Sequence, residues 1–338
     1  MKTTVLKLIS LVLLSMVCSA VDARSWQINN KVHYLADFHD INAAMASSDV
    51  VDGDTLYLGA GFVSESSQDI KKRVTVIGTG WGYDDSPAVC AKINSTLAIK
   101  ASGVKLVGLY VIGNINIQTT CHAVCIERCR FNQITLSGSY TNNDFKIHSC
   151  RFNRISLYNN TGWEVKNCIV ESTSSLMSNF NNAVFENNVF VNSGGGVVIE
   201  ATKYSVIRNN IIVCGSNGAD VNSVNVANLV NDGNNTVTDN VMTISPEYGD
   251  KYPGNVYAGT LDYAAIFKCS GSVNSGEYYM LAEGSPAIGA GTNGSDCGIM
   301  GGVYKFAPYG RPDNIPVIKK FTASDTPTNG KINVTIGF

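Results

Sequence analysis

A short pattern recurs about every 20 residues through the middle of the chain. In each copy a marker residue has one apolar residue three positions earlier and another two positions later, as Ile126 and Phe131 flank Cys129. A period near 20 with β-branched and aromatic residues is typical of a chain that winds into stacked coils, so it predicts a β-solenoid. Seven copies, spaced by 20, 21, 18, 20, 22 and 30 residues, have as markers Leu109, Cys129, Cys150, Cys168, Asn188, Asn210 and Asn240.

The alternation within each copy predicts which side chains point inward. The flanking apolar residues would stack on their equivalents in the next coil, about 4.8 Å away. The marker would lie at a sharp corner, where a stacked Asn can bond backbone groups and its neighbours. A small buried Cys fills the same position without a polar demand, so the column of Cys129, Cys150 and Cys168 is interpreted as packing rather than redox chemistry.

Composition agrees with coils that have many tight corners. The 338 residues include 35 Asn, 32 Gly and 8 Pro, and only 15% are charged, against roughly 25% in an average soluble domain. The 27 acidic and 25 basic residues give a net charge of −2, which argues against a nucleic-acid or anionic-membrane surface. The 44% hydrophobic content supports a large core and argues against disorder.

With about three short strands per coil, residues 74–302 resemble the right-handed parallel β-helix, or pectate-lyase-like, superfamily of exported bacterial type. Residues 38–48 resemble its helical cap, residues 51–58 its first strand, and residues 284–302 its closing segment. The resemblance implies an all-β, single-stranded right-handed parallel β-helix with an N-terminal helical cap and a short C-terminal β tail. The expected division is signal peptide 1–23, cap and first strand 24–62, β-helix 63–305 and β tail 306–338.

The first 23 residues predict export. Lys2 and Lys7 precede an apolar stretch, Leu8 to Val17, that is too short to span a bilayer, and Ala23 offers a cleavage site. A lipidated Cys18 is the less favoured alternative. We expect a location in the periplasm, on the outer surface or outside the cell, with no transmembrane segment. Nine cysteines would remain, and this odd number leaves at least one unpaired or paired with another molecule.

The family's enzymes act on acidic polysaccharides, its lyases with Ca²⁺ held by carboxylates and its hydrolases with several Asp. This chain lacks a compact acidic cluster, so no cofactor is identified, and Ca²⁺ is only what the resemblance implies for a lyase. Glu200 with Lys203 is one acid–base pair, and a surface ion pair is the alternative. Two further readings stay open, a carboxylate group in the longest coil (Asp220, Asp232 and Asp239) and a metal site at Cys121, Cys125 and Cys129.

Two outward columns carry charge. One is expected to form a ladder of ion pairs with a structural histidine in it (Glu127, His148, Lys166, Glu186 and Arg208). The other stacks Arg130 on Arg151, whose charges could be neutralised by Glu127, Asp144 or Glu171, or by the acidic groups of a polysaccharide. The predicted substrate-binding residues are Arg130, Arg151, Arg154, Tyr158, Glu200 and Lys203.

Two functions follow from this set. The first is an exported β-helix protein that binds or processes an acidic polysaccharide, with β-elimination by a lyase as the catalytic form rather than glycoside hydrolysis. The alternative is a non-catalytic adhesin or scaffold at the cell surface. A monomer whose partner is a polysaccharide, not a nucleic acid, is expected in both cases.

Overall fold

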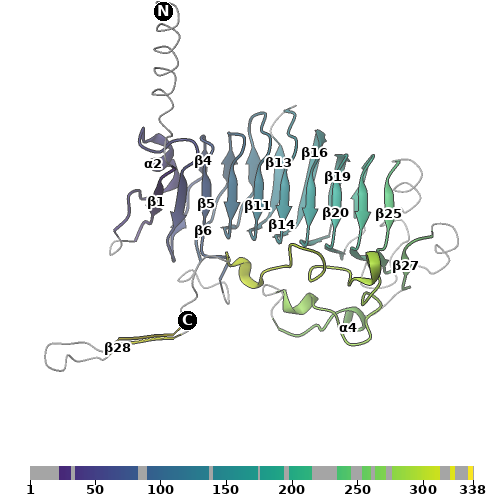
Figure 1. Cartoon of the computed structure of the whole chain (residues 1–338). Coiled ribbons are helices and arrows are strands. Elements are labelled where there is room, and N and C mark those ends of the chain that lie inside the picture. The colour runs from purple at the N-terminus through teal and green to yellow at the C-terminus, as the bar shows by residue number, and fades with distance from the viewer. Residues whose placement is uncertain are drawn as a thin grey trace, which may run out of the picture.

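Three parallel sheets run along the molecule, and successive coils add one strand to each sheet (Figure 1). All strand pairs between coils are parallel, in the register that the repeat predicts, for example Ile126 beside Ile147 and Ile147 beside Val165. The predicted all-β parallel β-helix is therefore confirmed. The computed structural model describes residues 23–31, 35–82, 90–136, 140–173, 176–193, 198–214, 234–244, 253–259, 263–271, 276–312, 320–323 and 334–337.

The sheets are named here A, B and C in the order in which a coil visits them. Sheet A contains β1 (Ser25–Ile28), β2 (Thr55–Leu58), β5 (Thr75–Ile77), β8 (Lys105–Val107), β11 (Cys125–Glu127), β14 (Lys146–His148), β17 (Glu164–Lys166), β20 (Val184–Glu186), β23 (Val206–Arg208) and β25 (Thr236–Thr238). Sheet B contains β3 (Val63–Ser64), β6 (Lys92–Ile93), β9 (Tyr110–Val111), β12 (Arg130–Phe131), β15 (Arg151–Phe152), β18 (Ile169–Ser172), β21 (Val189–Asn192), β24 (Ile211–Cys214), β26 (Val241–Met242) and β27 (Val256–Tyr257). Sheet C contains β4 (Gln68–Ile70), β7 (Leu97–Ile99), β10 (Ile115–Ile117), β13 (Gln133–Leu136), β16 (Arg154–Thr161), β19 (Met177–Asn181) and β22 (Ile199–Glu200).

The core between the sheets is made of the apolar residues that flank each marker. Ile126, Ile147 and Phe185 are fully buried, and the rings of Phe131 and Phe152 stack with their centroids 5.0 Å apart. Trp163, which its register also places inside, is 1% exposed. Identical positions in successive coils meet in this way because parallel strands without a register shift place like residues side by side.

The corner between sheets A and B is held by a continuous ladder of marker side chains. The residue before each marker has a left-handed backbone, as at Arg128 (φ 53°), so the chain turns within one residue. The marker's N–H then donates to the marker side chain of the next coil, for example Cys150 N to Cys168 Sγ (3.4 Å) and Cys168 N to Asn188 Oδ1 (2.9 Å). Cys and Asn are thus equivalent acceptors here, and the interpretation of the cysteines as corner packing agrees with their burial.

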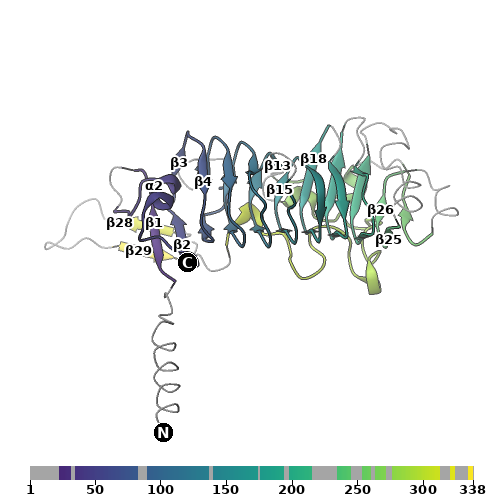
Figure 2. The same cartoon turned by 90° about the horizontal axis from the view of Figure 1, so that it is seen from above.

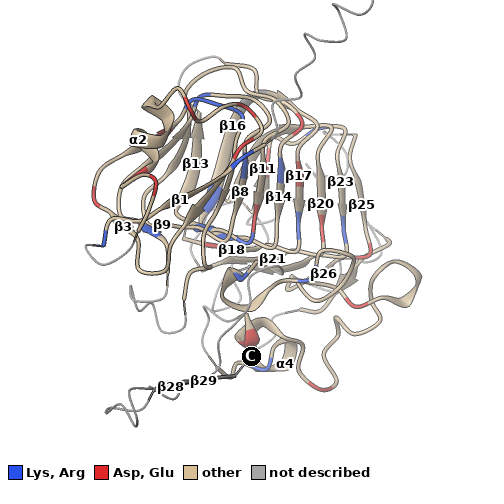
Figure 3. Ribbon diagram, turned by 60° about the vertical axis from the view of Figure 1, so that its left-hand side comes forward, with Lys and Arg blue, Asp and Glu red and all other residues tan. Residues whose placement is uncertain are grey.

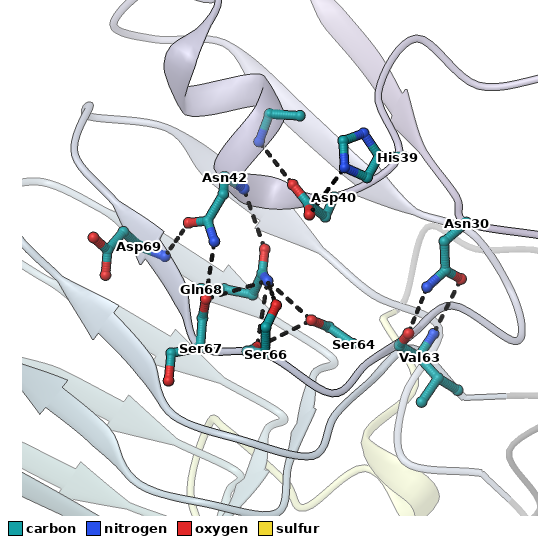
Figure 4. A network of polar contacts seen from close by, with 11 residues as sticks. Asn30, His39, Asp40, Asn42, Val63, Ser64, Ser66, Ser67, Gln68 and Asp69 are labelled. Atoms are coloured by element: carbon teal, nitrogen blue, oxygen red, sulfur yellow. Dashed lines mark hydrogen bonds and ion pairs between the residues drawn. The ribbon is translucent and has the colours of Figure 1, made fainter.

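The N-terminal end of the core is covered by a short helix, α2 (Ile41–Ala46), which buries Ile41, Ala44 and Met45. Asp40 caps it by accepting the Ala43 N–H at 2.7 Å. Figure 4 shows how Asn42 fastens the helix to the first coil, since its Nδ2 donates to Ser67 O (2.9 Å) and its Oδ1 accepts from Asp69 N (2.8 Å). The helix is shorter than the predicted segment 38–48.

The C-terminal part of the chain differs from the prediction that coils continue to residue 305. The described coil strands end at β27, and residues 263–271 and 276–312, here called the return segment, run back along the coils (Figures 1 and 2). The segment contains α4 (Tyr263–Ile266), η4 (Glu277–Tyr279), η5 (Thr292–Gly294) and η6 (Pro308–Gly310), and the tail beyond it forms an antiparallel pair of β28 (Lys320–Ala323) and β29 (Val334–Gly337). The predicted signal peptide lies outside the described residues, apart from Ala23.

The return segment docks through the residues that precede the markers. Asn209 Oδ1 accepts from Thr292 N (2.9 Å), Asn167 Nδ2 donates to Gly301 O (2.6 Å), and Arg128 Nη1 donates to Arg311 O (2.8 Å). The segment also covers an apolar outer face of sheet B, which makes a second core of residues including Ile169, Val189, Ile211, Val241, Phe267, Ile299 and Phe306. Of the glycines in residues 284–302, Gly298, Gly301 and Gly302 allow close approach to the coils, because a Cβ at these positions would meet the side chain of Ile211 or Asn187.

Candidate functional site

The structure divides the six predicted binding residues between two faces. Arg130 and Arg151 are neighbours on β12 and β15 of sheet B. Arg154 and Tyr158 lie on β16 of sheet C, and Glu200 lies on β22 of the same sheet. Lys203 follows β22, and its backbone forms an isolated β-bridge with Asn181. The side chain of Tyr158 is outside the described part. The six residues therefore do not form one surface.

The arginine column of sheet B takes part in internal contacts. Arg151 donates from Nη2 (2.7 Å) and Nε (3.0 Å) to one oxygen of Glu171, whose other oxygen accepts the hydroxyl of Tyr279 in the return segment. Burial and the Glu171 charge raise the pKa of that hydroxyl. The guanidinium of Arg130 lies over the ring of Tyr110, 4.6 Å from its centroid. Arg151 is thus neutralised by Glu171 and helps to anchor the return segment.

Sheet C presents a stripe of short neutral polar side chains on its outer face. Asn116, Thr135, Ser156 and Ser178 follow one another in successive coils, and Glu200 continues the column. Thr135 donates its hydroxyl to Asn116 Oδ1, and Ser178 donates to Ser156 Oγ at 2.8 Å. The stripe therefore contains two hydrogen-bonded pairs, and its side chains are half-buried at Asn116, Thr135 and Ser156 and buried at Ser178.

A polar hollow of about 400 Å³ adjoins this stripe where sheet C turns toward sheet A. Its wall contains no charged residue, and Tyr204, the one aromatic residue in it, is 60% exposed. Arg154 and Lys203 are exposed on the same side, and the described residues include no ion-pair partner for either. The hollow is lined by Thr141, Asn143, Asn160, Thr161, Asn181, Asn182 and Tyr204. We call this hollow, the stripe and these two cations the sheet C surface.

Figure 3 colours the charged positions of sheet A, in which Lys166, Glu186 and Arg208 pair as expected, whereas Glu127 pairs with Lys105 outside the predicted column. Lys105 contacts Glu127 at 2.8 Å, Lys166 contacts Glu186 at 3.6 Å, and Arg208 contacts the same Glu186 at 2.8 Å. The Lys105 partner is one reason why the pKa of Glu127 is lowered, against the opposing effect of burial. The ladder explains why charges of both signs occupy this face.

His148 is the member of the ladder that behaves differently from the prediction of a simple structural histidine. It is 2% exposed, and neither ring nitrogen has a hydrogen-bond partner in the described structure. Its Nε2 lies 3.7 Å from Glu164, and its ring stacks on Tyr304 of the return segment with centroids 4.1 Å apart. A hollow of about 590 Å³ opens beside it. This site could not be predicted from the repeat, because six of its ten lining residues are residues 303–308.

The pH dependence of the free energy of unfolding should reflect the burial of His148. Burial lowers the pKa of His148 to about 4. The carboxylates of Glu164 and Glu127 raise this pKa, whereas the positive charges of Lys166 and Lys146 lower it. The unfolded chain takes up this proton near pH 6.5, whereas the folded chain does so near pH 4. The free energy of unfolding is therefore not reduced by His148 above pH 6.5. It falls as the pH drops toward 4, by up to about 3 kcal/mol. Urea titrations across this range should show a shallower pH dependence for His148→Phe than for the wild type, and equal slopes would contradict the assignment.

The remaining acidic and thiol candidates do not assemble. Asp220 and Asp232 lie outside the described residues, and Asp239 accepts the hydroxyl of Thr292 at 2.9 Å, so it anchors the return segment. The Cys121 thiol shares a hydrogen bond with the Thr119 hydroxyl, and the Cys125 thiol donates a hydrogen bond to Glu127. Burial is the main reason why the pKa of Cys125 is raised to about 12. Within the described chain no three His, Cys, Asp or Glu side chains are grouped to hold a metal. Seven cysteines with described side chains are free thiols, at positions 121, 125, 129, 150, 168, 269 and 297.

The architecture defines the class of the molecule as a parallel β-helix protein. Comparison of the chain with protein-family models, with curated proteins and with solved structures found no match. Among the described helices, none is long and apolar enough to cross a membrane.

Proposed function

We propose that this protein is an exported member of the pectate-lyase-like superfamily that binds an acidic polysaccharide along the sheet C surface. The observation that carries the proposal is the row of outward amide and hydroxyl groups from Asn116 to Ser178, which ends beside a polar hollow with an exposed tyrosine. A polysaccharide is a linear polymer with hydroxyl groups at regular intervals, so a straight row of hydrogen-bonding side chains is complementary to it. Tyr204 supplies a flat apolar face for a sugar ring.

The preference for acidic chains rests on Arg154 and Lys203. Both are exposed at the sheet C surface, and neither is consumed by an ion pair among the described residues. Arg binds a carboxylate through two parallel hydrogen bonds, and Lys binds it as a point charge. Arg130 and Arg151 are less suited to this role, because Arg151 already binds Glu171 and both face the side on which the return segment packs.

Binding without turnover is the form of the proposal that the side chains support best. A β-elimination needs a base and cations that neutralise the uronate carboxyl, and calcium-assisted forms need clustered carboxylates. In the described outward column of sheet C, carboxylates occur only at the two ends, at Asp69 and Glu200. We therefore favour a non-catalytic glycan-binding protein of the cell surface over a lyase.

Removal of the two cations should weaken binding to an acidic chain. For Arg154→Ala with Lys203→Ala we expect about a 100-fold loss of affinity for polygalacturonate, at roughly tenfold for each charge-assisted contact. Affinity for neutral dextran should change by much less. Calorimetric titration measures both, and absorbance of unsaturated products in the same samples detects a lyase.

Arg208→Ala is the matched control, because Arg208 is also a cation on the surface but belongs to the ladder of sheet A. It should leave both affinities unchanged. Equal binding of polygalacturonate by the wild type and the double variant would show that the sheet C cations do not bind the chain.

A further inference from the structure

The hollow between sheet A and the return segment has the features of a small-molecule site. Its volume of about 590 Å³ falls in the range usual for ligand pockets. One wall is polar and comes from the coils, and the other is largely apolar and comes from the return segment. The lining residues are Glu127, Arg128, His148, Ser149, Val303, Tyr304, Lys305, Phe306, Ala307 and Pro308.

The two nitrogens of His148 provide the chemical evidence for a ligand. A neutral imidazole has one N–H donor and one acceptor nitrogen, and both are buried here without a protein partner. A buried polar group that is left unpaired costs folding energy, so such groups are rare unless something else satisfies them. The two nitrogens point away from each other in the ring plane, so one group of a ligand can bond only one of them, and a hydroxyl, which both donates and accepts, suits either.

The charges around the hollow narrow the class of ligand. Glu127 is paired with Lys105 at 2.8 Å, and Arg128 donates to Arg311 O at 2.8 Å, so these groups already have partners. Lys305 is exposed at the rim. The chemistry at His148 is thus that of a neutral imidazole, which a ligand hydroxyl can bond, and two cations, Arg128 and Lys305, also line the hollow.

The return segment supplies the wall that faces the carbon skeleton of such a molecule. The Tyr304 ring lies on His148 and is 42% exposed, so it covers the imidazole from the solvent side. The backbone behind it is fixed, since Ser149 Oγ donates to Tyr304 O at 2.7 Å and to Lys305 O at 3.2 Å. These two bonds hold the backbone and not the ring, so a turn of the Tyr304 side chain would leave them in place.

From this geometry we propose that the hollow is a second binding site, separate from the sheet C surface, which takes one sugar ring. One nitrogen of His148 bonds a ring hydroxyl, Tyr304 moves from the imidazole onto the C–H face of the ring, and Val303 and Pro308 complete the apolar wall. Neutral hexoses and hexuronates share this ring chemistry. Lys305 distinguishes them, because it would bind only the carboxylate of a hexuronate.

The test follows the imidazole signals of His148 by NMR during titration with glucose, galactose, N-acetylglucosamine, glucuronate and galacturonate. The three other histidines, at positions 33, 39 and 122, serve as internal references. We expect a saturable shift of the His148 signals with at least one sugar. Calorimetric titration, which does not depend on the His148 signal, gives the affinities of the variants. His148→Phe, which keeps a flat ring without donors or acceptors, should lower the affinity at least tenfold, and Tyr304→Ala should lower it several-fold.

The control variants separate this site from the proposed function. Arg154→Ala with Lys203→Ala should leave sugar binding in the hollow unchanged, whereas it weakens polysaccharide binding. Lys305→Ala should weaken binding of uronates only, and an equal effect on all sugars would assign the site to neutral hexoses. The proposal is overturned if no sugar gives a saturable shift, or if His148→Phe, folded as judged by its thermal transition, binds sugar as the wild type does.

Discussion

Replacement of Asn210 by alanine should destabilise the protein by about 4 kcal/mol, since it leaves several buried polar groups without partners. Asn210 is fully buried in the corner ladder. Its Nδ2 donates to Phe185 O (2.9 Å) and to Asn240 Oδ1 (2.9 Å), and its Oδ1 accepts from both nitrogens of Asn188 (2.9 Å each). Alanine removes all four bonds and leaves a cavity between two coils. The change in free energy of unfolding from urea titration measures the loss.

The matched control is Asn153→Ala, which cuts a similar contact in solvent. Asn153 Nδ2 donates to Asn132 Oδ1 at 2.8 Å, but both side chains are exposed, so water can replace the bond. We expect this variant to cost less than about 0.5 kcal/mol. Asn210→Cys should fall between the two, because a Cys at a corner still accepts the neighbouring N–H, as Cys168 Sγ does from Cys150 N. Equal costs at Asn210 and Asn153 would mean that burial does not set the strength of the ladder.

The coils could be predicted from the sequence because each is specified locally and then repeated. Strand alternation determines which residues point inward, and the stacking of identical positions makes the pattern visible in one chain. Ile126, Ile147 and Val165 therefore occupy the places that their spacing from the markers predicts. The polar ladder was predictable for the same reason, since Asn188, Asn210 and Asn240 share one position in their repeats.

The return segment could not be predicted in this way, because its anchors share a position but no common chemistry. Arg128, Asn167 and Asn209 each use a different group to hold it, and their partners lie far along the chain. One signal was nevertheless present. The outward column that begins with the cations Arg130 and Arg151 becomes apolar from Ile169 onward, and an apolar outward face must be covered by something.

The candidate sites also differ in how far they could be predicted, depending on whether their residues belong to the repeat or to the return segment. The residues of sheet C belong to the repeat, so Arg154 and Glu200 could be assigned to one face from their distance to the markers. The partner of Arg151 was left open among Glu127, Asp144, Glu171 and a glycan, and the structure shows Glu171, whose contact Tyr279 of the return segment completes. His148 was placed correctly in the ladder, but its burial depends on Tyr304, a residue that no repeat pattern relates to it.

The docking of the return segment gives the second large prediction, at Gly310. Its φ of +61° already disfavours a side chain, and a Cβ there would clash with the carbonyl oxygen of Arg128 and with the ring of Trp81. The carbonyl belongs to a coil corner and cannot move away, and Trp81 is fully buried. Gly310→Ala should therefore cost roughly 3 kcal/mol, from overpacking added to backbone strain. Urea titration measures this loss.

Gly284→Ala separates the two contributions to that cost. Gly284 has a similar φ of +75°, but nothing lies within 4 Å of the place where its Cβ would be. It should therefore cost only about 1 kcal/mol, the usual strain of alanine at positive φ. In hydrogen exchange, Gly310→Ala alone should expose amides near Trp81 and at the Arg128 corner, because the end of the segment detaches there. Equal costs in the two variants would mean that backbone strain explains both and that Gly310 is not packed against the coils.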